Sequence, residues 1–342
     1  MPAEWCPHQA TWLSWPHNPE TWPGVLADAE RAMADAVAAL APHERVHINV
    51  LDDRHAEHVG ALLEGRVAKG QVRFERIPTD DAWIRDYGAI VVADGDGFAA
   101  LDFEYNAWGG KYPPFDQDRA VALQMADILG LRRIARPMIL EGGSIDVNGR
   151  GLAIVTEQCL LNPNRNPGMN RDAIEACLAE AFGLTGILWL GDGVAGDDTD
   201  GHVDNLARFV DTGRVVCAVA ADRSDIDHAP LDANLKRLEA FRDREGRRLD
   251  VVELPQPDPV FRGDDRLPAS YANFYIANSV VLMPAYGSRA DDRASGILQD
   301  CFPGREIVPI DCRALIVGLG ALHCLTQQIP VMVSNRIQTG NE

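Results

Sequence analysis

A loose internal repeat constrains the fold of this chain more than any other feature of its sequence. A polar residue recurs ahead of a hairpin-like pair of strands, and a helical pattern usually follows each hairpin. The recurring residues are Asp86, Glu141, His202, Asn273 and Cys324. They stand about 50 to 70 residues apart, and self-similarity at such a period is typical of radial or solenoid repetition. In a radial arrangement they would converge on one axis, so residues far apart in the sequence would form one site.

Strand and helix patterns alternate along the chain, which predicts an α/β or α+β fold. Turns that tolerate positive φ, such as Asn148-Gly149, mark the hairpins. Residues 254–270 are rich in Pro, Asp and Gly and are predicted to form a long loop. No low-complexity linker divides the sequence, so we expect a single domain over residues 1–342. Amphipathic helical patterns cover residues 27–40, 118–129, 170–182, 231–241 and 291–302.

The charge balance narrows the class of partner. The chain carries 51 acidic against 32 basic residues, a net charge of −19. This balance argues against nucleic acid, because phosphate binding needs a surplus of lysine and arginine. A small cationic partner fits a negative field, although solubility alone would also account for the charge. No apolar stretch approaches the roughly 18–20 residues that span a bilayer, and a secretory pattern is missing. We therefore expect a cytoplasmic protein with no membrane partner, and homo-oligomer formation stays open.

The seven cysteines are odd in number and form no CxxC pair, which argues against a disulfide framework. Cys159, Cys177 and Cys217 lie in apolar runs and are predicted to be inert buried thiols. Cys324 follows the glycine-rich run 318–320, and glycines let a backbone approach a ligand closely. An accessible thiolate there would be a nucleophile, and a buried core thiol is the alternative. Phosphate binding fits poorly, because no Gly-Lys-Ser/Thr follows.

Two acids stand where predicted strands begin. Alternation along a strand would place Asp86 on the same face as Ile84, opposite Trp83. A carboxylate in that position is costly unless it is paired, so Asp86 is either a site residue or a structural partner of a turn or an arginine. Glu141 precedes two glycines and is either a site residue at a strand entrance or part of a turn.

Residues 197–204 hold four acids and one histidine. In a strand that starts near Gly201, His202 and Asp204 would share a face and Val203 would lie opposite. A carboxylate and an imidazole on one face can hold a cation and relay a proton. Metal binding is one alternative, although the spacing fits no calcium loop and no H-E-x-x-H occurs. A purely structural acidic loop is the other.

Taken together, these residues fit the chemistry of a guanidinium group. A guanidinium is planar, cationic and a poor electrophile. Its hydrolysis needs carboxylates for its N–H groups, a soft nucleophile for its central carbon and a proton donor for the departing ammonia. Asp86 and Asp204 would be the carboxylates, Cys324 the nucleophile and His202 the proton donor. This set requires neither a metal nor an organic cofactor.

The order and spacing of nine motifs resemble one family. The chain is similar to the agmatine deiminases and the related bacterial peptidyl-arginine deiminases, over nearly its whole length to Pro330. The motifs that carry the resemblance are residues 1–5, 11–16, 83–86, 105–110, 140–144, 161–167, 201–205, 271–275 and 323–328, which read MPAEW, TWLSWP, WIRD, YNAWGG, LEGGS, LNPNRNP, GHVDN, YANFY and HCLTQQ.

The resemblance implies a five-fold pseudosymmetric α/β propeller (a pentein) of ββαβ-type units, with the active site on its axis. It implies Cys324 as the nucleophile, His202 as acid and base, and Asp86 and Asp204 as clamps on the guanidinium. Glu141 would lie close to them. The single domain would then be catalytic and would need no cofactor or metal.

Two further residues take a role from the resemblance. Trp83 would form a wall of the substrate channel, and Asp198 would lie near the far amine of the substrate. The expected reaction converts agmatine and water to N-carbamoylputrescine and ammonia through a covalent cysteine intermediate.

Departures from the family pattern bear on the substrate tail. Residues 318–321 read Gly-Leu-Gly-Ala where the family usually has Gly-Gly-Gly-Asn, and Asp146 stands where a histidine is common. The loop at residues 197–200 is also more acidic than in many relatives.

Other functions remain open on the sequence. Free arginine, substituted arginine or C-terminal peptidyl-arginine could replace agmatine, and their carboxylate would need a basic partner such as Arg165, Arg208 or Arg289. A polyamine-binding protein without catalysis and a metal-dependent hydrolase are the remaining alternatives.

Overall fold

The computed structural model describes residues 1–332. Four of its sheets share one connectivity, in which an antiparallel hairpin is followed by a third strand parallel to the hairpin's second strand. The four sheets are β4 (Ile90–Asp94), β5 (Gly97–Glu104), β6 (Arg132–Ile139); β7 (Ile145–Val147), β8 (Leu152–Thr156), β9 (Gly186–Leu190); β10 (Ala207–Asp211), β11 (Arg214–Val219), β12 (Asp250–Pro255); and β15 (Tyr275–Ile276), β16 (Val280–Ala285), β17 (Glu306–Asp311). The repeat in the sequence is thus a repeat of structure.

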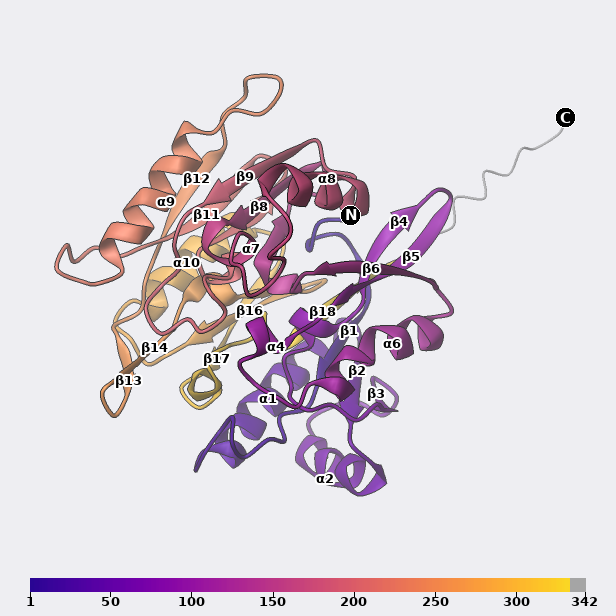
Figure 1. Ribbon diagram of the computed structural model, residues 1–342. Coiled ribbons are helices and arrows are strands. Elements are labelled where there is room, and N and C mark those ends of the chain that lie inside the picture. Colours follow the sequence, from indigo (N-terminus) through magenta and orange to yellow (C-terminus); the bar gives the residue numbers. More distant parts are fainter. Residues whose placement is uncertain (333–342) are drawn as a thin grey trace, which may run out of the picture.

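A fifth sheet joins the two ends of the described chain. β18 (Thr326–Pro330) pairs antiparallel with β1 (His8–Ser14), and β2 (Arg45–Val50) and β3 (Val72–Arg76) continue in parallel. β18 and β1 lie side by side near the centre of Figure 1. This pairing repeats the connectivity of the other four sheets and brings the segment around Cys324 next to the N-terminal segment.

Helices connect the parallel strands of each sheet. Figure 1 shows α2, α6, α8 and α9 toward the outside of the molecule. The helices are α1 (Leu26–Leu40), α2 (Asp53–Leu63), α3 (Ile84–Tyr87), α4 (Ala107–Gly110), α5 (Asp116–Arg119), α6 (Val121–Leu129), α7 (Glu157–Leu160), α8 (Arg171–Phe182), α9 (His228–Ala240) and α10 (Asp291–Cys301). The short 3₁₀ turns are η1 (Gly142–Ser144), η2 (Val203–Asn205), η3 (Tyr271–Asn273) and η4 (Leu315–Gly318).

Helix α8 shows how the sequence sets these boundaries. The side chain of Asn170 accepts a hydrogen bond from the N–H of Ala173 and caps the first turn. Gly183 ends the helix in the left-handed conformation, which costs glycine little. Ile174 and Leu178 lie four residues apart and are both buried, so one face of the helix packs on the core.

The five predicted helices are confirmed to within a few residues at each end, and the chain has a mixed α/β fold. The helix predicted over residues 118–129 is divided into α5 and α6 at Ala120. The prediction of a long loop over residues 254–270 is wrong in part. That segment contains a small hairpin of β13 (Val260–Arg262) and β14 (Asp265–Leu267).

The strand assignments around the candidate site residues are wrong. Asp86 lies in the helical turn α3, so Trp83, Ile84 and Asp86 do not alternate along a strand. His202 precedes η2 and Asp204 lies within it, so they do not share a strand face. A four-residue helical turn and the start of a strand leave the same short pattern of apolar and polar residues, and alternation alone cannot separate them.

Buried tryptophans mark the part of the core formed by the N-terminal segment. Trp12, Trp15 and Trp22 have no exposed surface. The indole N–H of each donates a hydrogen bond to an oxygen atom. Their large apolar rings are therefore buried without an unpaired donor. Residues 1–332 contain no helix with the length and apolarity that crossing a membrane requires.

Candidate active site

A pocket of about 820 Å³ has Cys324 and Asp86 among its lining residues. Both are almost completely buried, with 5% and 4% of their surfaces exposed, so they belong to its inner end. Trp83 and Trp108 also line it. Six carboxylates line the pocket, namely Glu20, Asp80, Asp81, Asp86, Asp118 and Asp198. The site therefore has the shape and charge to hold a small cation.

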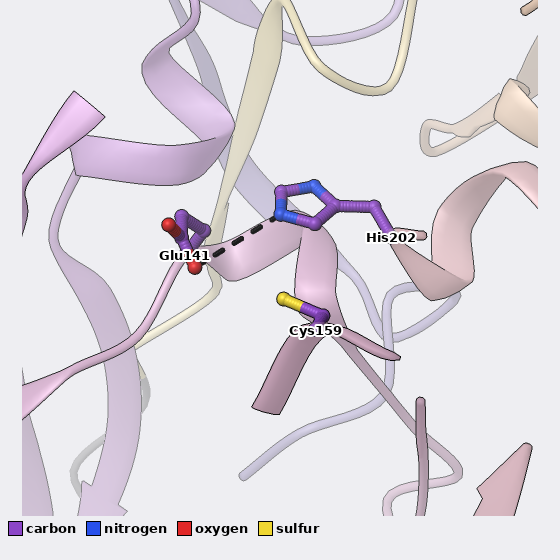
Figure 2. Close-up of side chains that lie close together, drawn as sticks. All are labelled: Glu141, Cys159 and His202. Atoms are coloured by element: carbon purple, nitrogen blue, oxygen red, sulfur yellow. Dashed lines mark ion pairs between the residues drawn. The ribbon is translucent and has the colours of Figure 1, made fainter. Parts of the chain in front are cut away.

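His202 lies among the side chains behind this inner end. Its Nδ1 is 3.7 Å from Asp86 Oδ1, and its Nε2 is 4.0 Å from Glu141 Oε2. Figure 2 shows His202 and Glu141 facing one another, with the Cys159 thiol directed to the same space. Neither ring nitrogen of His202 has a hydrogen-bond partner within residues 1–332. The imidazole is held by packing and charge, and both nitrogens are free to take part in proton transfer.

Charge sets the protonation of this histidine. Burial alone would lower the pKa of His202, but Asp86, Cys159 and Glu141 outweigh it and raise the pKa well above the ordinary value. The free enzyme therefore holds His202 as an imidazolium at neutral pH. That form is the one that can give a proton to a leaving group.

Gly143 is the point on which three of these side chains converge. A Cβ atom there would lie 2.7 Å from His202 Nδ1, 2.8 Å from Asp86 Oδ1 and 3.0 Å from Asp204 Oδ2. The backbone N–H of Gly143 donates to Asp86 Oδ1 at 2.9 Å. Only a residue without a side chain lets the backbone of η1 approach so closely.

Asp86 is fixed by two donors, the N–H of Gly143 and the indole N–H of Trp108, which lies 3.0 Å from Oδ2. Trp108 adopts φ 55° and ψ 44°, a left-handed conformation that is costly for a tryptophan. Burial raises the pKa of Asp86, and Asp204 and Glu141 add to this rise while His202 opposes it.

The Cys324 thiol contacts the carboxylate of Asp204 and the side-chain amide of Asn273. Its Sγ lies 3.5 Å from Asp204 Oδ2 and accepts a hydrogen bond from Asn273 Nδ2 at 3.1 Å. Burial raises the pKa of the Cys324 thiol well above 9, and Asp204 and Asp86 raise it further. Burial and the two carboxylates therefore favour the protonated thiol, and a cation beside Cys324 would favour the thiolate.

Asp204 differs from Asp86 in its protonation. Burial would raise the pKa of Asp204, but the hydrogen bond and charge of His323, with His202 and Arg208, lower it below the ordinary value. Its Oδ2 is occupied by His323 and the thiol of Cys324, whereas the buried Oδ1 lacks a partner among the described residues. The site thus contains one ionised carboxylate with an oxygen free for a ligand.

Trp83 packs against the glycine-rich turn that precedes Cys324. A Cβ atom on Gly318 or Gly320 would lie 2.8 Å or 2.4 Å from the Trp83 ring. Leu319 between them adopts φ +71° and lines the pocket. The two residues of this turn that depart from the family pattern are therefore placed differently: Leu319 lies at the pocket wall, and Ala321 is buried.

Asp198 lies at the accessible part of the pocket, with 44% of its side chain exposed. It accepts hydrogen bonds from Lys111 Nζ at 3.2 Å and from the Tyr112 hydroxyl. Asp198 is therefore separate from the buried group of Cys324, Asp86, Asp204, His202 and Glu141, which the structure does bring together.

Sequence reasoning missed three residues at the site. Cys159, predicted to be inert, lies with Glu141 and His202 so that one ligand atom of each falls within 4.8 Å of the others. These donors are of the types that zinc takes, so this trio is the place where a metal could be held. Glu4 and His323 were quoted as parts of motifs but given no role, and they form hydrogen bonds behind Asp204.

Replacing Gly143 with alanine tests the convergence of the site. The Cβ would displace His202, Asp86 or Asp204, and a shift of about 1 Å costs about 100-fold in rate. We expect kcat/KM with the enzyme's substrate to fall about 100-fold or more while the melting temperature stays near that of the wild type. Gly213→Ala is the matched control, since no atom within residues 1–332 lies within 4 Å of its added Cβ. A Gly143→Ala enzyme with wild-type kcat/KM would contradict this geometry.

Comparison with known proteins places the chain in a family. The family model described as Porphyromonas-type peptidyl-arginine deiminase matches residues 1–330. Agmatine deiminases from Stutzerimonas stutzeri and Ectopseudomonas mendocina are 38% and 37% identical to the chain, and each match covers 96% of this chain and 95% of the relative.

Solved structures agree with this placement. The agmatine deiminase of Enterococcus faecalis superposes with a TM-score of 0.90 at 31% identity, covering 96% of this chain and 95% of that one. A cysteine-to-serine variant of the C. jejuni agmatine deiminase with substrate bound gives 0.87 at 32% identity and the same coverage. An amidinotransferase from Microseira wollei, at 13% identity and a TM-score of 0.53, covers 96% of both chains and shares the fold alone. The chain belongs to the Porphyromonas-type peptidyl-arginine deiminase family.

Proposed function

We propose that this protein is an agmatine deiminase, which hydrolyses agmatine to N-carbamoylputrescine and ammonia. The observation that carries the proposal is the meeting of Cys324, Asp204, Asp86 and His202 at the inner end of an acidic pocket. The two curated relatives and the Enterococcus faecalis and C. jejuni structures described above carry the same activity in their names.

Binding comes first in the proposed mechanism. The ionised Asp204 offers its free Oδ1 to an N–H of the guanidinium, and Asp86 lies across the same space. Trp83 and Trp108 line the same pocket, and aromatic rings attract a cation. The positive charge of the substrate stabilises the Cys324 thiolate, whose proton is released to water on binding.

Two chemical steps follow. The Cys324 sulfur bonds to the central carbon, His202 gives its proton to one nitrogen, and ammonia leaves with the breaking C–N bond. The neutral His202 then takes one proton from water as the oxygen bonds to the same carbon. The C–S bond breaks, and the remaining hydroxyl proton is released to solvent as the C=O bond of the product forms. The ureido product departs and the thiolate is restored, so agmatine and water give N-carbamoylputrescine and ammonia.

The charges along the pocket favour a substrate whose tail carries no carboxylate. The basic partners suggested for a carboxylate tail are engaged elsewhere: Arg165 bonds Glu141 and Asp200, and Arg208 bonds Glu4 and Asp146. A carboxylate would thus enter without a free cation from these two residues.

The remaining arginines give a carboxylate no better partner. Arg289 is 92% exposed and pairs with Asp258. Arg262 is the single arginine or lysine among the described residues that line the pocket, and it donates to the carbonyl of Pro23. Agmatine ends in an amine, which suits the outer carboxylate of Asp198 if it displaces Lys111.

The proposal includes the arrangement of the sheets. We infer that the five sheets of shared connectivity surround the site as five pseudosymmetric units of one catalytic domain. Support comes from the candidate residues themselves, because Asp86, Glu141, His202, Asn273 and Cys324 stand before successive hairpins and lie close together.

Kinetics on three substrates test this function. We expect ammonia release from agmatine, with a kcat/KM about 100-fold above that for arginine, because the carboxylate of arginine would meet the acidic lining of the pocket without a free cationic partner. A C-terminal arginine peptide is the third arm. Equal kcat/KM values for arginine and agmatine would contradict the assignment of the tail, and binding of agmatine without ammonia release would support a non-catalytic polyamine-binding protein.

Chelation tests the metal-dependent alternative. The proposed mechanism routes no step through a metal, so we expect the rate of ammonia release to survive exhaustive treatment with a chelator. Loss of activity that zinc restores would point instead to the trio of Glu141, Cys159 and His202.

The pH dependence of thiol reactivity tests the charge assigned to Asp204. Alkylation requires the thiolate, so iodoacetamide should modify Cys324 slowly at neutral pH and faster as the pH rises through the raised pKa. Asp204→Asn removes a negative neighbour and lowers that pKa, and each unit is worth about tenfold in thiolate. We expect faster alkylation of Cys324 at pH 7.5 to 9 in the variant, measured by peptide mapping, together with loss of turnover. Slower alkylation would contradict the account.

A further inference from the structure

Two buried residues lie in a line behind the carboxylate of Asp204. His323 Nδ1 is 2.8 Å from Asp204 Oδ2, and His323 Nε2 is 2.9 Å from Glu4 Oε2. Glu4, His323 and Asp204 are each less than a tenth exposed. The line therefore runs from the N-terminal segment through the residue before the nucleophile to the candidate substrate ligand.

Both ring nitrogens of His323 act as donors. Burial opposes ionisation of Glu4, but Arg208 and His323 lower the pKa of Glu4 well below its ordinary value. The pKa of Asp204 is also lowered. An ionised carboxylate only accepts hydrogen bonds, so each nitrogen that faces one must carry a hydrogen. His323 thus joins the carboxylates of Asp204 and Glu4 through its two ring nitrogens.

Neighbouring groups hold His323 and Glu4 in place. The backbone N–H of His323 donates to Asn273 Oδ1 at 3.0 Å, and its carbonyl accepts from Arg85 Nε at 3.2 Å. Glu4 is fixed in turn by Arg208 Nη2 at 2.8 Å and by the N–H of Ile276 at 2.8 Å. An N-terminal residue is usually free to fray, and here it is tied to three distant segments of the chain.

The hydrogen bond from His323 determines which oxygen of Asp204 is left without a hydrogen-bond partner. Oδ2 is taken by His323 Nδ1 and faces the Cys324 thiol, whereas Oδ1 is buried and has no hydrogen-bond partner among residues 1–332. Without this donor the carboxylate could rotate, and nothing would keep Oδ1 rather than Oδ2 without a partner. A fixed donor on one side is what keeps the other oxygen available.

We propose that His323, anchored by Glu4, is a positioning residue that keeps Asp204 ionised and turned so that its Oδ1 receives the substrate guanidinium. This inference rests on the proposed function, because it assigns Asp204 to the grip on that group. The Glu4–His323–Asp204 line also connects the N-terminal segment to the nucleophile. Glu4 is one end of the line, and Cys324 contacts Asp204 at the other end.

Two isosteric variants separate positioning from a merely structural role. In His323→Asn the amide nitrogen takes the place of Nδ1 and keeps a donor to Asp204 while losing the donor to Glu4. In His323→Gln the amide nitrogen takes the place of Nε2 and keeps the donor to Glu4 while losing the one to Asp204. Both variants remove the ring and leave a similar buried amide, so their effects on melting temperature should be similar.

The expected result is a difference in kinetics without a matching difference in stability. We expect kcat/KM for agmatine to be at least tenfold higher in His323→Asn than in His323→Gln. The dissociation constant of agmatine, measured by calorimetry in a Cys324→Ala background, should follow the same order. Equal values in the two variants, or the reverse order, would overturn the proposal.

A third variant keeps the test decisive if the histidine variants do not fold. Glu4→Gln retains an acceptor for His323 and removes the charge that fixes it, so kcat/KM of the folded variant should fall several-fold. Loss of the buried ion pair with Arg208 should lower the melting temperature as well. Unchanged kcat/KM in folded Glu4→Gln would overturn the proposal. Failure of the proposed function looks different, because the wild-type enzyme itself would then release no ammonia from agmatine.

Discussion

Cys324→Ala is expected to abolish ammonia release from agmatine, with a loss of about 10⁴-fold or more. The sulfur is the atom that bonds to the guanidinium carbon in the proposed mechanism, and water at the same place lacks its nucleophilicity. The substitution removes one buried atom at the edge of the pocket, so we expect the free energy of unfolding to change by only about 1 kcal/mol. Steady-state kinetics and thermal unfolding measure the two effects.

Cys217→Ala is the matched control for this variant. Cys217 is also fully buried, but it lies on β11 within a core cluster and does not line the pocket. It should cost a similar amount of stability and leave turnover intact. Substantial ammonia release by Cys324→Ala, or equal losses in both variants, would show that Cys324 is not the nucleophile.

His202→Asn is expected to lower kcat about 10² to 10⁴-fold with a smaller change in KM, because it removes the proton donor and base from both chemical steps. The ring nitrogens of His202 lack hydrogen-bond partners in the described part of the chain, so the substitution breaks no hydrogen bond of the folded protein. The loss should therefore be one of catalysis rather than of folding.

His47→Asn serves as the control for His202. His47 is buried against Glu75 at 2.7 Å and stacks on Trp12, remote from the residues that line the pocket. Its replacement should affect stability and spare kcat. A His202→Asn enzyme whose kcat equals that of the wild type would remove His202 from the mechanism.

The sequence predicted the repeat, the five helices and the residues that gather at the site. The site residues could be predicted because they stand in recognisable motifs at repeated spacings. That signal does not depend on assigning the local secondary structure correctly. Asp86 and Asp204 were assigned to strands and instead lie in short helical turns, yet their side chains still meet. The catalytic roles of these residues stay predictions that the variants above test.

Other parts of the site could not be predicted, for a physical reason. His323 and Glu4 are 319 positions apart, and their contact exists only because β18 pairs with β1. Cys159 lies in an apolar run that is typical of a core thiol, and only its approach to His202 and Glu141 distinguishes it. Contacts of this kind arise from tertiary packing and leave no local signal.

Trapping the covalent intermediate tests the central claim most directly. Wild-type enzyme mixed rapidly with agmatine and quenched in acid would be analysed by intact-mass spectrometry and peptide mapping. The account predicts an adduct with the mass of agmatine less ammonia, carried by the peptide that contains Cys324. Turnover with no adduct, or an adduct on another residue, would contradict it.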